Sequence, residues 1–406
     1  MRSLALAVTV AASALLVAAS PASAALDSDP DATWMTGGIV YALTQSGNTI
    51  YAAGKFRALR PCPITTSCSG TIPTVNVGAF DATTGAGISS FRVDVGVAGD
   101  GSKVYALAVL NGKLYIGGQF SSVDGQPRLN MAVLDLSTGA LDPIAPQVGV
   151  DTTSYVRGMI TYGDRLYIAG KFSSVDGSRR QKLAAFTSDG ALDPAWRPRV
   201  SQGIARSFAL TCDDRLIVGG TFVGAAGTRG ADQARKFLAI FDPVSGALDQ
   251  WSPDNANMEN GLASYDIAVD PGCNSMYVGM GGSNHLMKID LSDALGNIMW
   301  DMHTGGNVQT VAVYGQRVLL GGHFTTTPAA PNSTSKVQRI RFATVDHDGN
   351  ALSDWSPEFS GKFLGPWDIL TNETAAQVWV GGAFTYVNAV EQDFVARFSN
   401  VPLTLP

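Results

Sequence analysis

The stretch Tyr115–Gly125, YIGGQFSSVDG, returns 52 residues later as YIAGKFSSVDG at Tyr167–Gly177. A second element, ALDP at 140–143, returns as ALDPAW at 191–196. Short apolar runs and glycine turns that recur with a period near 50 residues are typical of a repeat architecture. We therefore divide the chain into similar units before considering any function.

Each unit contains a box that resembles Gly-Gly-x-Phe. The boxes are Ala53–Phe56, Gly117–Phe120, Ala169–Phe172, Gly219–Phe222, Gly279–Gly282, Gly321–Phe324 and Gly381–Phe384, with a mean spacing of about 55 residues. The fifth box lacks the phenylalanine, and a short segment follows it. We therefore expect the fifth unit to pack less well than the others.

Four strand-like runs fit into each unit. In the second unit they are Val104–Val109, Leu114–Phe120, Asn130–Leu136 and Ala140–Pro143. The turn Asn111-Gly112 favours a two-residue hairpin, because both of its residues tolerate positive φ. Helical periodicity is absent throughout the chain, so the pattern predicts four antiparallel strands per unit.

Seven such units predict an all-β fold, a seven-bladed β-propeller of four-stranded antiparallel blades. The predicted units are 37–101, 102–154, 155–203, 204–262, 263–306, 307–363 and 364–400. The seventh unit stops without a fourth run, whereas residues 25–34 resemble one and end in Trp34. We expect residues 25–34 to supply the outer strand of the last blade and to close the ring, so that 25–406 form one domain.

Most fourth runs end in an aromatic residue. These residues are Phe91, Trp196, Trp251, Trp300 and Trp355. Burial of a tryptophan removes about 150–250 Å² from water. We therefore interpret them as core residues and not as a surface for sugar stacking.

The pattern YxGGxF…VDG…LAxxD…TGALDPxW resembles the delta-sixty repeat of secreted bacterial β-propellers, which is similar in appearance to kelch repeats. The resemblance covers nearly the whole chain after residue 24. It implies the propeller fold. It implies no single shared activity and no catalytic residue set.

The first 24 residues have the features of a secretory signal peptide. Arg2 precedes the apolar run Leu4–Ala19, and Pro21–Ala24 provides a small-residue cleavage site. A retained membrane anchor is the alternative, although the run is short for a span. We expect a soluble, extracellular protein without a membrane span.

The charge balance disfavours a nucleic-acid partner. The chain is 45% hydrophobic and 15% charged, with 28 basic and 34 acidic residues. Removal of Arg2 with the signal peptide leaves 27 basic residues and a net charge of −7. Non-specific binding of nucleic acid requires a basic surface instead.

Four cysteines in an exported chain predict two disulfides with three possible pairings. Cys62 and Cys68 flank a short loop, and Cys212 and Cys273 occupy similar positions in consecutive units. We therefore pair Cys62 with Cys68 and Cys212 with Cys273. A metal site is the alternative, but neither pair has zinc-ligand spacing or a nearby histidine.

A ring of side chains is the main candidate site. Alignment of the first run across the units places one residue of each unit two positions before a shared apolar residue. These residues are Tyr41, Tyr105, Arg157, Arg206, Tyr265, Gln309 and Trp367. Because the first run is normally the innermost strand of a blade, we expect them to surround the channel mouth. Aromatic and arginine side chains there suit sugar rings and carboxylates, and filling of the channel is the alternative.

The connections between runs two and three point to the same face. They are longest in units one, four and six, and insertions on one face of a repeat protein often mark its binding face. Segments 57–74, 121–130, 173–182, 223–236, 325–341 and 385–394 hold twelve basic and five acidic residues. Such a rim attracts anions, but ordinary loop arginines that keep the surface soluble are the favoured explanation.

No catalytic, cofactor or metal motif emerges. Asp346–Asn350 resembles the start of a calcium loop, but its glycine comes one position early and the closing glutamate is missing. The histidines are His285, His303, His323 and His347, and His323 occupies a variable box position. Neither G-x-S-x-G nor H-E-x-x-H occurs.

These observations favour a secreted, monomeric, non-catalytic propeller that binds a glycan or another anionic ligand on its loop-bearing face, without a cofactor. One alternative is a polysaccharide lyase that uses Tyr41, Tyr105 or Tyr265 as its base beside an arginine of the ring. A hydrolase would need paired carboxylates, and Asp266 and Asp368 are the only obvious acids beside the ring. A protein-interaction scaffold is the third possibility.

Overall fold

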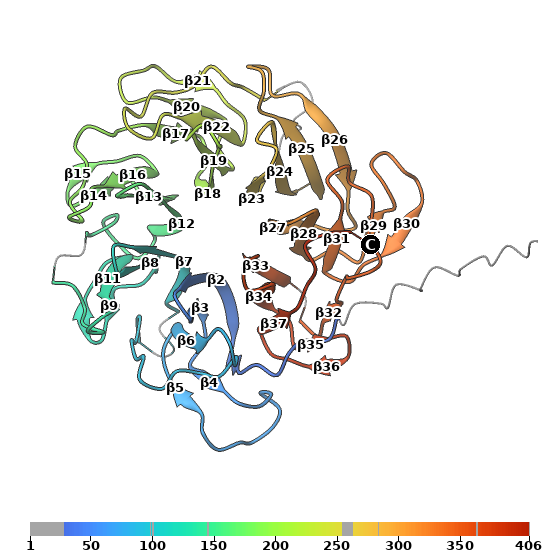
Figure 1. Cartoon of the computed structure of the whole chain (residues 1–406). Coiled ribbons are helices and arrows are strands. Elements are labelled where there is room, and N and C mark those ends of the chain that lie inside the picture. The colour runs from blue at the N-terminus through green and yellow to red at the C-terminus, as the bar shows by residue number, and fades with distance from the viewer. Residues whose placement is uncertain are drawn as a thin grey trace, which may run out of the picture.

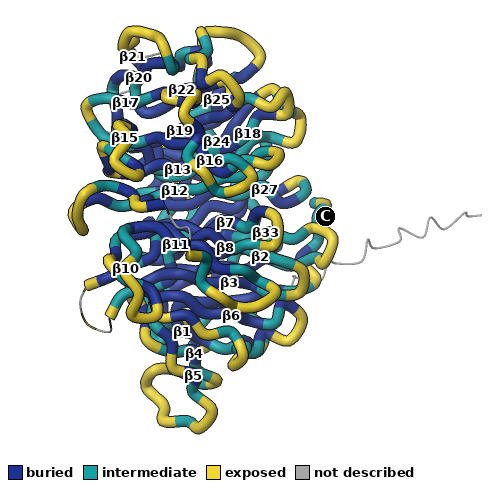
Figure 2. Tube along the Cα trace, turned by 90° about the vertical axis from the view of Figure 1, so that its left-hand side faces the viewer, coloured by how far each residue is buried: buried dark blue, intermediate teal, exposed yellow. Residues whose placement is uncertain are grey.

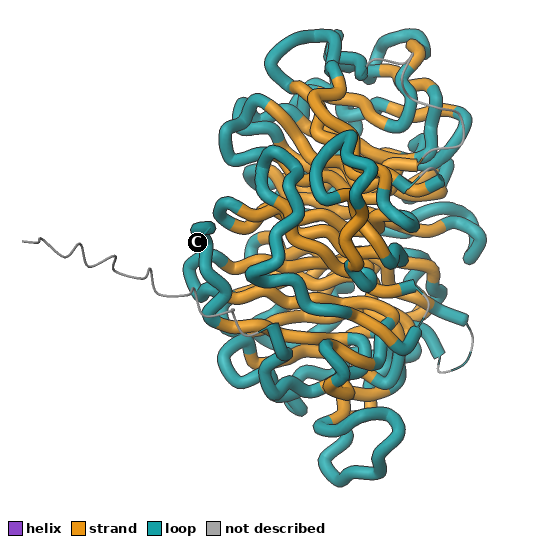
Figure 3. Tube along the Cα trace, turned by 90° about the vertical axis from the view of Figure 1, so that its right-hand side faces the viewer, coloured by secondary structure: helices purple, strands orange, loops and turns teal. Residues whose placement is uncertain are grey.

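A computed structural model describes residues 28–97, 99, 101–143, 146–253, 263–282, 284–362 and 364–405. The predicted signal peptide and residues 25–27 lie outside this part. Its regular elements are all strands (Figure 3). A helix with the length and hydropathy of a membrane span is not found among the described residues.

Seven sheets of the described chain share one plan and stand around a common centre (Figure 1). We call them radial sheets one to seven, in chain order. Their innermost strands are β2 (Ile39–Ser46), β7 (Lys103–Leu110), β12 (Tyr155–Tyr162), β18 (Ala205–Leu210), β23 (Ala263–Val269), β27 (Val308–Tyr314) and β33 (Gly365–Asn372). Each forms an antiparallel hairpin with the next strand along the chain.

The second and third strands complete most of these sheets. The second strands are β3 (Thr49–Lys55), β8 (Lys113–Gln119), β13 (Arg165–Lys171), β19 (Leu216–Gly220), β24 (Ser275–Gly281), β28 (Arg317–Gly322) and β34 (Gln377–Ala383). The third strands are β6 (Val77–Asp81), β11 (Met131–Asp135), β16 (Leu183–Phe186), β22 (Leu238–Phe241), β25 (His285–Asp290), β31 (Phe342–Val345) and β37 (Val395–Ser399).

The hydrophobic core lies between neighbouring sheets, where the strands are buried (Figure 2). One cluster joins Tyr51 and Val77 of sheet one to Leu114 and Ile116 of sheet two. Each innermost strand also contacts the innermost strand of the next sheet, and β33 contacts β2. The contacts between innermost strands therefore run in a complete circle.

In the part of the chain that the structure describes, the predicted fourth strand forms only in the fifth sheet, as β26 (Ile298–His303). In five other sheets, the fourth run contributes one bridging pair, such as Leu134 with Leu141. In the third and fourth units an aspartate ends this run by accepting a hydrogen bond from a backbone N–H two residues later, from Ala195 to Asp193 at 2.8 Å and from Trp251 to Asp249 at 2.7 Å. Each turn of this kind takes the chain out of the ladder before a strand can form.

The fifth sheet does not pack loosely, so that expectation was wrong. It has four strands, and every residue of β24 is buried. Methionines fill the space near the missing phenylalanine, since Met276, Met280 and Met287 join one core cluster. Flexible thioether side chains adapt well to such irregular gaps.

The tryptophans of the fourth runs are core residues, as predicted for Trp196, Trp251 and Trp355, which are at most 1% exposed. The indole Nε1 of Trp196 donates to the carbonyl of Asp242 at 3.3 Å, and that of Trp251 donates to Asp290 at 3.0 Å. Each of these side chains therefore connects its own unit to the next sheet.

Small accessory sheets occupy the ends of the loops. They contain β1 (Met35–Thr36), β4 (Ala58–Arg60), β5 (Ile72–Pro73), β9 (Ser122–Val123), β10 (Gln126–Pro127), β14 (Ser174–Val175), β15 (Ser178–Arg179), β17 (Arg199–Ser201), β20 (Gly224–Ala226), β21 (Gln233–Ala234), β29 (Thr326–Pro328), β30 (Lys336–Gln338), β32 (Phe359–Ser360), β35 (Tyr386–Val387) and β36 (Val390–Glu391). Pairing of β1 with β4, β17 with β20 and β32 with β35 joins the segment before an innermost strand to the connection that follows a second strand. These connections therefore lie side by side.

The N-terminal segment packs against the last sheet but is not a strand in its described part. The backbone N–H of Asp31 donates to the carbonyl of Arg397 at 2.8 Å, and its carboxylate lies 3.1 Å from Nε of Arg397. Trp34 packs against a cluster that includes Phe80 of sheet one and Trp379 of sheet seven. The segment thus spans the junction between the first and last sheets.

Both predicted disulfides are present, Cys62–Cys68 and Cys212–Cys273. The second links the β18–β19 turn to the β23–β24 turn, and so joins the fourth and fifth sheets. The predicted pairing is confirmed.

Candidate functional site at the channel mouth

Every innermost strand carries a β-bulge near its start. The register of the ladder shifts across one residue in each strand, as between Val40 and Ala42 in β2. The residues inside the seven bulges are Tyr41, Tyr105, Arg157, Arg206, Tyr265, Gln309 and Trp367. A bulge leaves its extra residue unpaired and redirects its side chain. The residues of the predicted ring are thus the bulge residues.

The second glycine of the box allows this bulge. A Cβ atom on Gly118 would lie 2.1 Å from the carbonyl oxygen of Lys103, and one on Gly54 would lie 1.9 Å from that of Ile39. Only glycine permits such a close approach of two backbones. In the fifth sheet Met280 takes this position, and the ring of Tyr265 lies against Gly281 instead.

Aromatic rings gather on one side of the mouth. The ring centroid of Tyr41 lies 5.3 Å from that of Tyr105 and 5.7 Å from that of Trp367. Tyr155, the first residue of β12, lies 5.8 Å from Tyr105. These separations are typical of favourable aromatic pairs. The rings form a partly buried wall that offers both faces and edges to a ligand.

Two arginines complete the mouth. Cζ of Arg157 lies 5.4 Å from the ring centroid of Tyr105 and 5.8 Å from that of Trp367, and Cζ of Arg206 lies 4.3 Å from that of Tyr265. Burial lowers the pKa of both guanidinium groups, that of Arg206 to about 10. Both remain cationic at neutral pH, and each is attracted to the face of an aromatic ring.

Within the described residues, neither arginine of the mouth donates a hydrogen bond to a protein acceptor or forms an ion pair at contact distance, although the charges of Asp266 and Asp368 act on Arg157. The contrast with Arg317 is clear, because its guanidinium donates to both oxygens of Asp354, at 2.9 and 2.5 Å. An arginine presents five N–H donors in a planar fork. Those of Arg157 and Arg206 therefore remain available to an acceptor that enters the mouth.

Two cavities meet at these side chains. The mouth cavity, of about 270 Å³, is lined by Tyr41, Tyr105, Tyr155, Arg157, Arg206 and Trp367. An inner cavity of about 230 Å³ shares four of these residues and continues to Tyr265, Asp266 and Asp368. Nε of Arg206 and Nε1 of Trp367 are buried and have no acceptor within the described chain. Unsatisfied buried donors beside a cavity are typical of a site that receives a polar ligand or water.

The two acids beside the ring connect neighbouring sheets. Asp266 accepts hydrogen bonds from the N–H of Val311 and the hydroxyl of Thr310, both at 3.0 Å. Asp368 accepts a 2.6 Å bond from the N–H of Leu43. Burial raises the pKa of both carboxyl groups, and the negative charge of Asp266 helps to raise that of Asp368 to about 7.

The structure brings most of the predicted ring together, with two differences. Tyr265 lines the inner cavity only. Gln309 lines neither cavity, because it is buried and its amide donates to the carbonyl of Pro366 at 3.0 Å. Sequence reasoning missed Tyr155, although its place two residues before Arg157 in the same strand was a usable signal.

The basic loops have a structural role that the sequence did not reveal. Arg180 is buried, and its guanidinium donates to the carbonyl of Asp193 at 2.8 Å. Arg128, Arg235 and Arg339 donate in the same way to the fourth runs of their own units. At least four of the twelve basic residues therefore brace the fold, which weakens the loops as evidence for an anion-binding rim.

The calcium-like segment forms an ordinary turn. Oδ1 of Asp346 accepts the N–H groups of Asp348 and Asn350 at 3.0 and 2.7 Å. An aspartate that caps its own turn in this way needs no ion to explain it.

Comparisons with known proteins agree with the radial arrangement. Residues 111–143 and 164–195 match the model of a family described as a β-propeller domain of unknown function, DUF5122. Among the solved structures, the WD40 repeats of RRP9 match 91% of this chain and 98% of their own, at 9% identity and a TM-score of 0.56. The chain is an all-β propeller.

Two further solved structures are similar to this chain. The computationally designed protein Ika8 matches 92% of this chain and 100% of its own, at 11% identity and a TM-score of 0.52. The extracellular domain of BT4673 from B. thetaiotaomicron matches 91% of this chain at 14% identity and a TM-score of 0.51, and this propeller spans 40% of that chain. No relative was found among the curated proteins. Identities this low establish the fold alone.

Proposed function

We propose that the protein is a secreted, seven-bladed propeller of the delta-sixty type that binds an anionic glycan at the channel mouth. The observation that carries this proposal is the pair Arg157 and Arg206, two cations without a protein acceptor among the described residues, beside a wall of aromatic rings. Two disulfides and the signal-like N-terminus support an extracellular location.

The chemistry of the mouth suits an acidic sugar. A uronate carboxylate would accept charge-assisted hydrogen bonds from the two guanidinium groups, and the apolar face of a sugar ring would stack on Tyr41 or Trp367. The mouth cavity, of about 270 Å³, lies just below the ~300–1,000 Å³ that is usual for drug-sized ligands. We therefore propose that the site receives one sugar at a chain end or side branch.

Binding is favoured over a lyase reaction by the state of the tyrosines. Burial is the main cause that raises the pKa of both Tyr41 and Tyr105, so both phenols stay protonated at neutral pH. A general base works best when its pKa lies near the working pH. Tyr41 and Tyr105 are therefore poorly suited to serve as the base of a lyase.

The test is a glycan array and calorimetry with uronic-acid polymers, using the whole secreted chain. Arg157→Ala should lose at least about tenfold in affinity, because charge-assisted hydrogen bonds contribute about 1.5–3 kcal/mol. Arg229→Ala, which removes an exposed loop arginine, is the matched control and should bind like the wild type.

Three results would contradict the proposal. Equal binding by wild type and Arg157→Ala would place the ligand elsewhere. An unsaturated product from the polymer would indicate a lyase. Absence of any bound glycan, together with a protein captured from the surface of the producing cell, would favour the interaction scaffold.

A further inference from the structure

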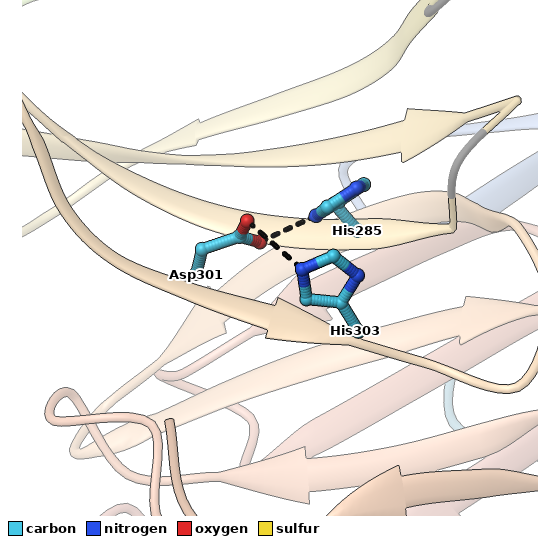
Figure 4. Close-up of side chains that lie close together, drawn as sticks. All are labelled: His285, Asp301 and His303. Atoms are coloured by element: carbon cyan, nitrogen blue, oxygen red, sulfur yellow. Dashed lines mark hydrogen bonds and ion pairs between the residues drawn. The ribbon is translucent and has the colours of Figure 1, made fainter. Parts of the chain in front are cut away.

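Three potential metal ligands meet in the fifth sheet, away from the channel mouth. Figure 4 shows His285 on β25 with Asp301 and His303 on β26, their side chains directed toward one another. The ladder explains this meeting, because His285 pairs directly with His303. Asp301 precedes His303 by two residues, so it projects from the same face of the strand.

The ligand atoms are close together. Nδ1 of His285 lies 2.6 Å from Oδ1 of Asp301, and Nε2 of His303 lies 3.5 Å from Oδ2 of the same carboxylate. The two imidazole centroids are 3.9 Å apart. One ligand atom from each residue can be chosen so that all three lie within 4.8 Å of one another.

We propose that His285, Asp301 and His303 bind a divalent transition-metal cation of the Zn²⁺ type. Zinc binds imidazole nitrogen and carboxylate oxygen at about 2.0–2.2 Å, which places tetrahedral ligand atoms about 3.3 Å apart. Nδ1 of His285 and Oδ1 of Asp301 are now in hydrogen-bond contact at 2.6 Å, so the ion would replace this hydrogen bond and the partly exposed carboxylate of Asp301 would move away from His285. The side chain of His303 is 70% exposed and would turn toward the ion. Two imidazoles favour zinc, copper or nickel over calcium and magnesium, which prefer oxygen ligands.

The burial of the three residues suits an ion that is bound on one side by protein and has one coordination position open to solvent. His285 is buried and fixed in the sheet, Asp301 is partly buried, and His303 faces solvent. Three protein ligands leave the fourth tetrahedral position to water. The ion would join β25 to β26, the outermost strand of the fifth sheet, and so stabilise this four-stranded sheet.

Metal binding should be measured on the whole secreted chain, without a polyhistidine tag and after treatment with a chelator. All four cysteines are in disulfides, so thiolates do not compete for the ion. Zn²⁺ titration in competition with a chromogenic chelator should show one tight site per chain. Zn²⁺ should also raise the Tm of the wild type, because an ion that binds only the folded state stabilises it.

His303→Ala should abolish both the tight site and the rise in Tm. Since His303 is exposed, this variant should fold, which keeps the test valid even where His285→Ala does not. His323→Gln is the control that removes a histidine elsewhere, and it should bind Zn²⁺ like the wild type. Absence of a tight site in the wild type, or retention of that site by His303→Ala, would overturn the proposal.

Discussion

At the scale of single residues, glycine and left-handed backbone positions set the shape of each unit. The second box glycine lies opposite the bulge, where the carbonyl of the innermost strand leaves no room for a side chain. The second glycine of the box therefore marks the position of the bulge in the sequence. The bulge in turn directs the side chains of the predicted ring toward the channel mouth.

Gly118→Ala is expected to destabilise the protein by more than about 2 kcal/mol. The new Cβ would meet the carbonyl oxygen of Lys103 at 2.1 Å, and a backbone atom cannot move aside as a flexible side chain can. Gly37→Ala is the control, since its Cβ would have only ordinary contacts at 3.7 Å or more. Chemical denaturation measures the free energy of unfolding of both variants. Equal stability of the two would mean that the close backbone approach at Gly118 does not require glycine.

A second set of residues adopts positive φ just before each third strand. Its members are Asn76, Asn130, Lys182, Phe237, Asn284, Arg341 and Phe394. Asparagine tolerates this region better than other side chains that carry a Cβ. Its amide also helps at these turns, because Oδ1 of Asn130 accepts the N–H of Phe120 at 3.2 Å while Nδ2 donates to Val148 at 2.8 Å.

Lys182→Asn should stabilise the protein by about 1 kcal/mol, because it relieves the left-handed strain and offers the same two hydrogen bonds. The reverse change, Asn130→Lys, should destabilise it by at least as much. Thermal unfolding of both variants measures the effect. A lower Tm for Lys182→Asn would show that its present bond to the carbonyl of Val200 matters more than the strain.

At the scale of elements, the fourth run is held by an arginine rather than by a ladder. Arg180, Arg128, Arg235 and Arg339 each donate to a backbone carbonyl of the fourth run in their own unit. A run that forms only one bridging pair therefore gains a second point of attachment, in place of the missing strand.

Arg180→Ala should reduce stability by about 2 kcal/mol, since it removes two hydrogen bonds to carbonyl oxygens and leaves those carbonyls without their donors. Arg179→Ala is a control at the adjacent position, where the side chain is exposed. Urea denaturation of the pair should separate the two arginines. Equal denaturation midpoints for the two variants would show that Arg180 does not stabilise the fold. The basic loops would then again be a candidate surface for binding anions.

Much of the architecture could be predicted from the sequence, because each unit repeats the same local signals. Alignment of the first runs found Tyr41, Arg157 and Trp367 together, since the bulge occupies the same position in every unit. The repeats could not show that Gln309 turns into the core, because that depends on the carbonyl of Pro366 in another unit. The pairing of His285 with His303 was hidden for a similar reason, since their spacing matches no local motif.

At the scale of the whole molecule, contacts between the first and last sheets hold the circle together. Asp368 of β33 accepts a hydrogen bond from Leu43 of β2, while Asp31 contacts Arg397 of β37. Trp34 and Trp379 pack with residues of the first sheet. The junction thus combines a partly buried carboxyl, an ion pair and apolar packing.

Stability should fall between about pH 4 and pH 7 through the carboxyl of Asp368. Its pKa is raised from 3.8 to about 7 in the folded protein, so the folded state keeps a proton that the unfolded state releases over this range. The cost is at most about 1.4 kcal/mol per pH unit, and it stays constant above pH 7. Asp368→Asn removes this dependence while its amide oxygen still accepts the N–H of Leu43.

The Tm of Asp368→Asn relative to the wild type should therefore rise from pH 4 to pH 8. Asp81→Asn provides a control of opposite sign, because backbone hydrogen bonds from Thr84 lower the pKa of Asp81. The wild-type advantage over that variant should grow as the pH rises through the range in which Asp81 ionises. A flat difference for Asp368→Asn would mean that this carboxyl stays ionised in the fold.

The bulges have a consequence for protein engineering. Because a bulge residue has no partner in the ladder, its identity is not tied to strand pairing, and the seven units already tolerate tyrosine, arginine, glutamine and tryptophan there. A combinatorial library confined to the five bulge positions that line the mouth cavity, Tyr41, Tyr105, Arg157, Arg206 and Trp367, should therefore retain a high proportion of folded members. The ligand specificity of the channel mouth could then be changed while the propeller scaffold stays the same.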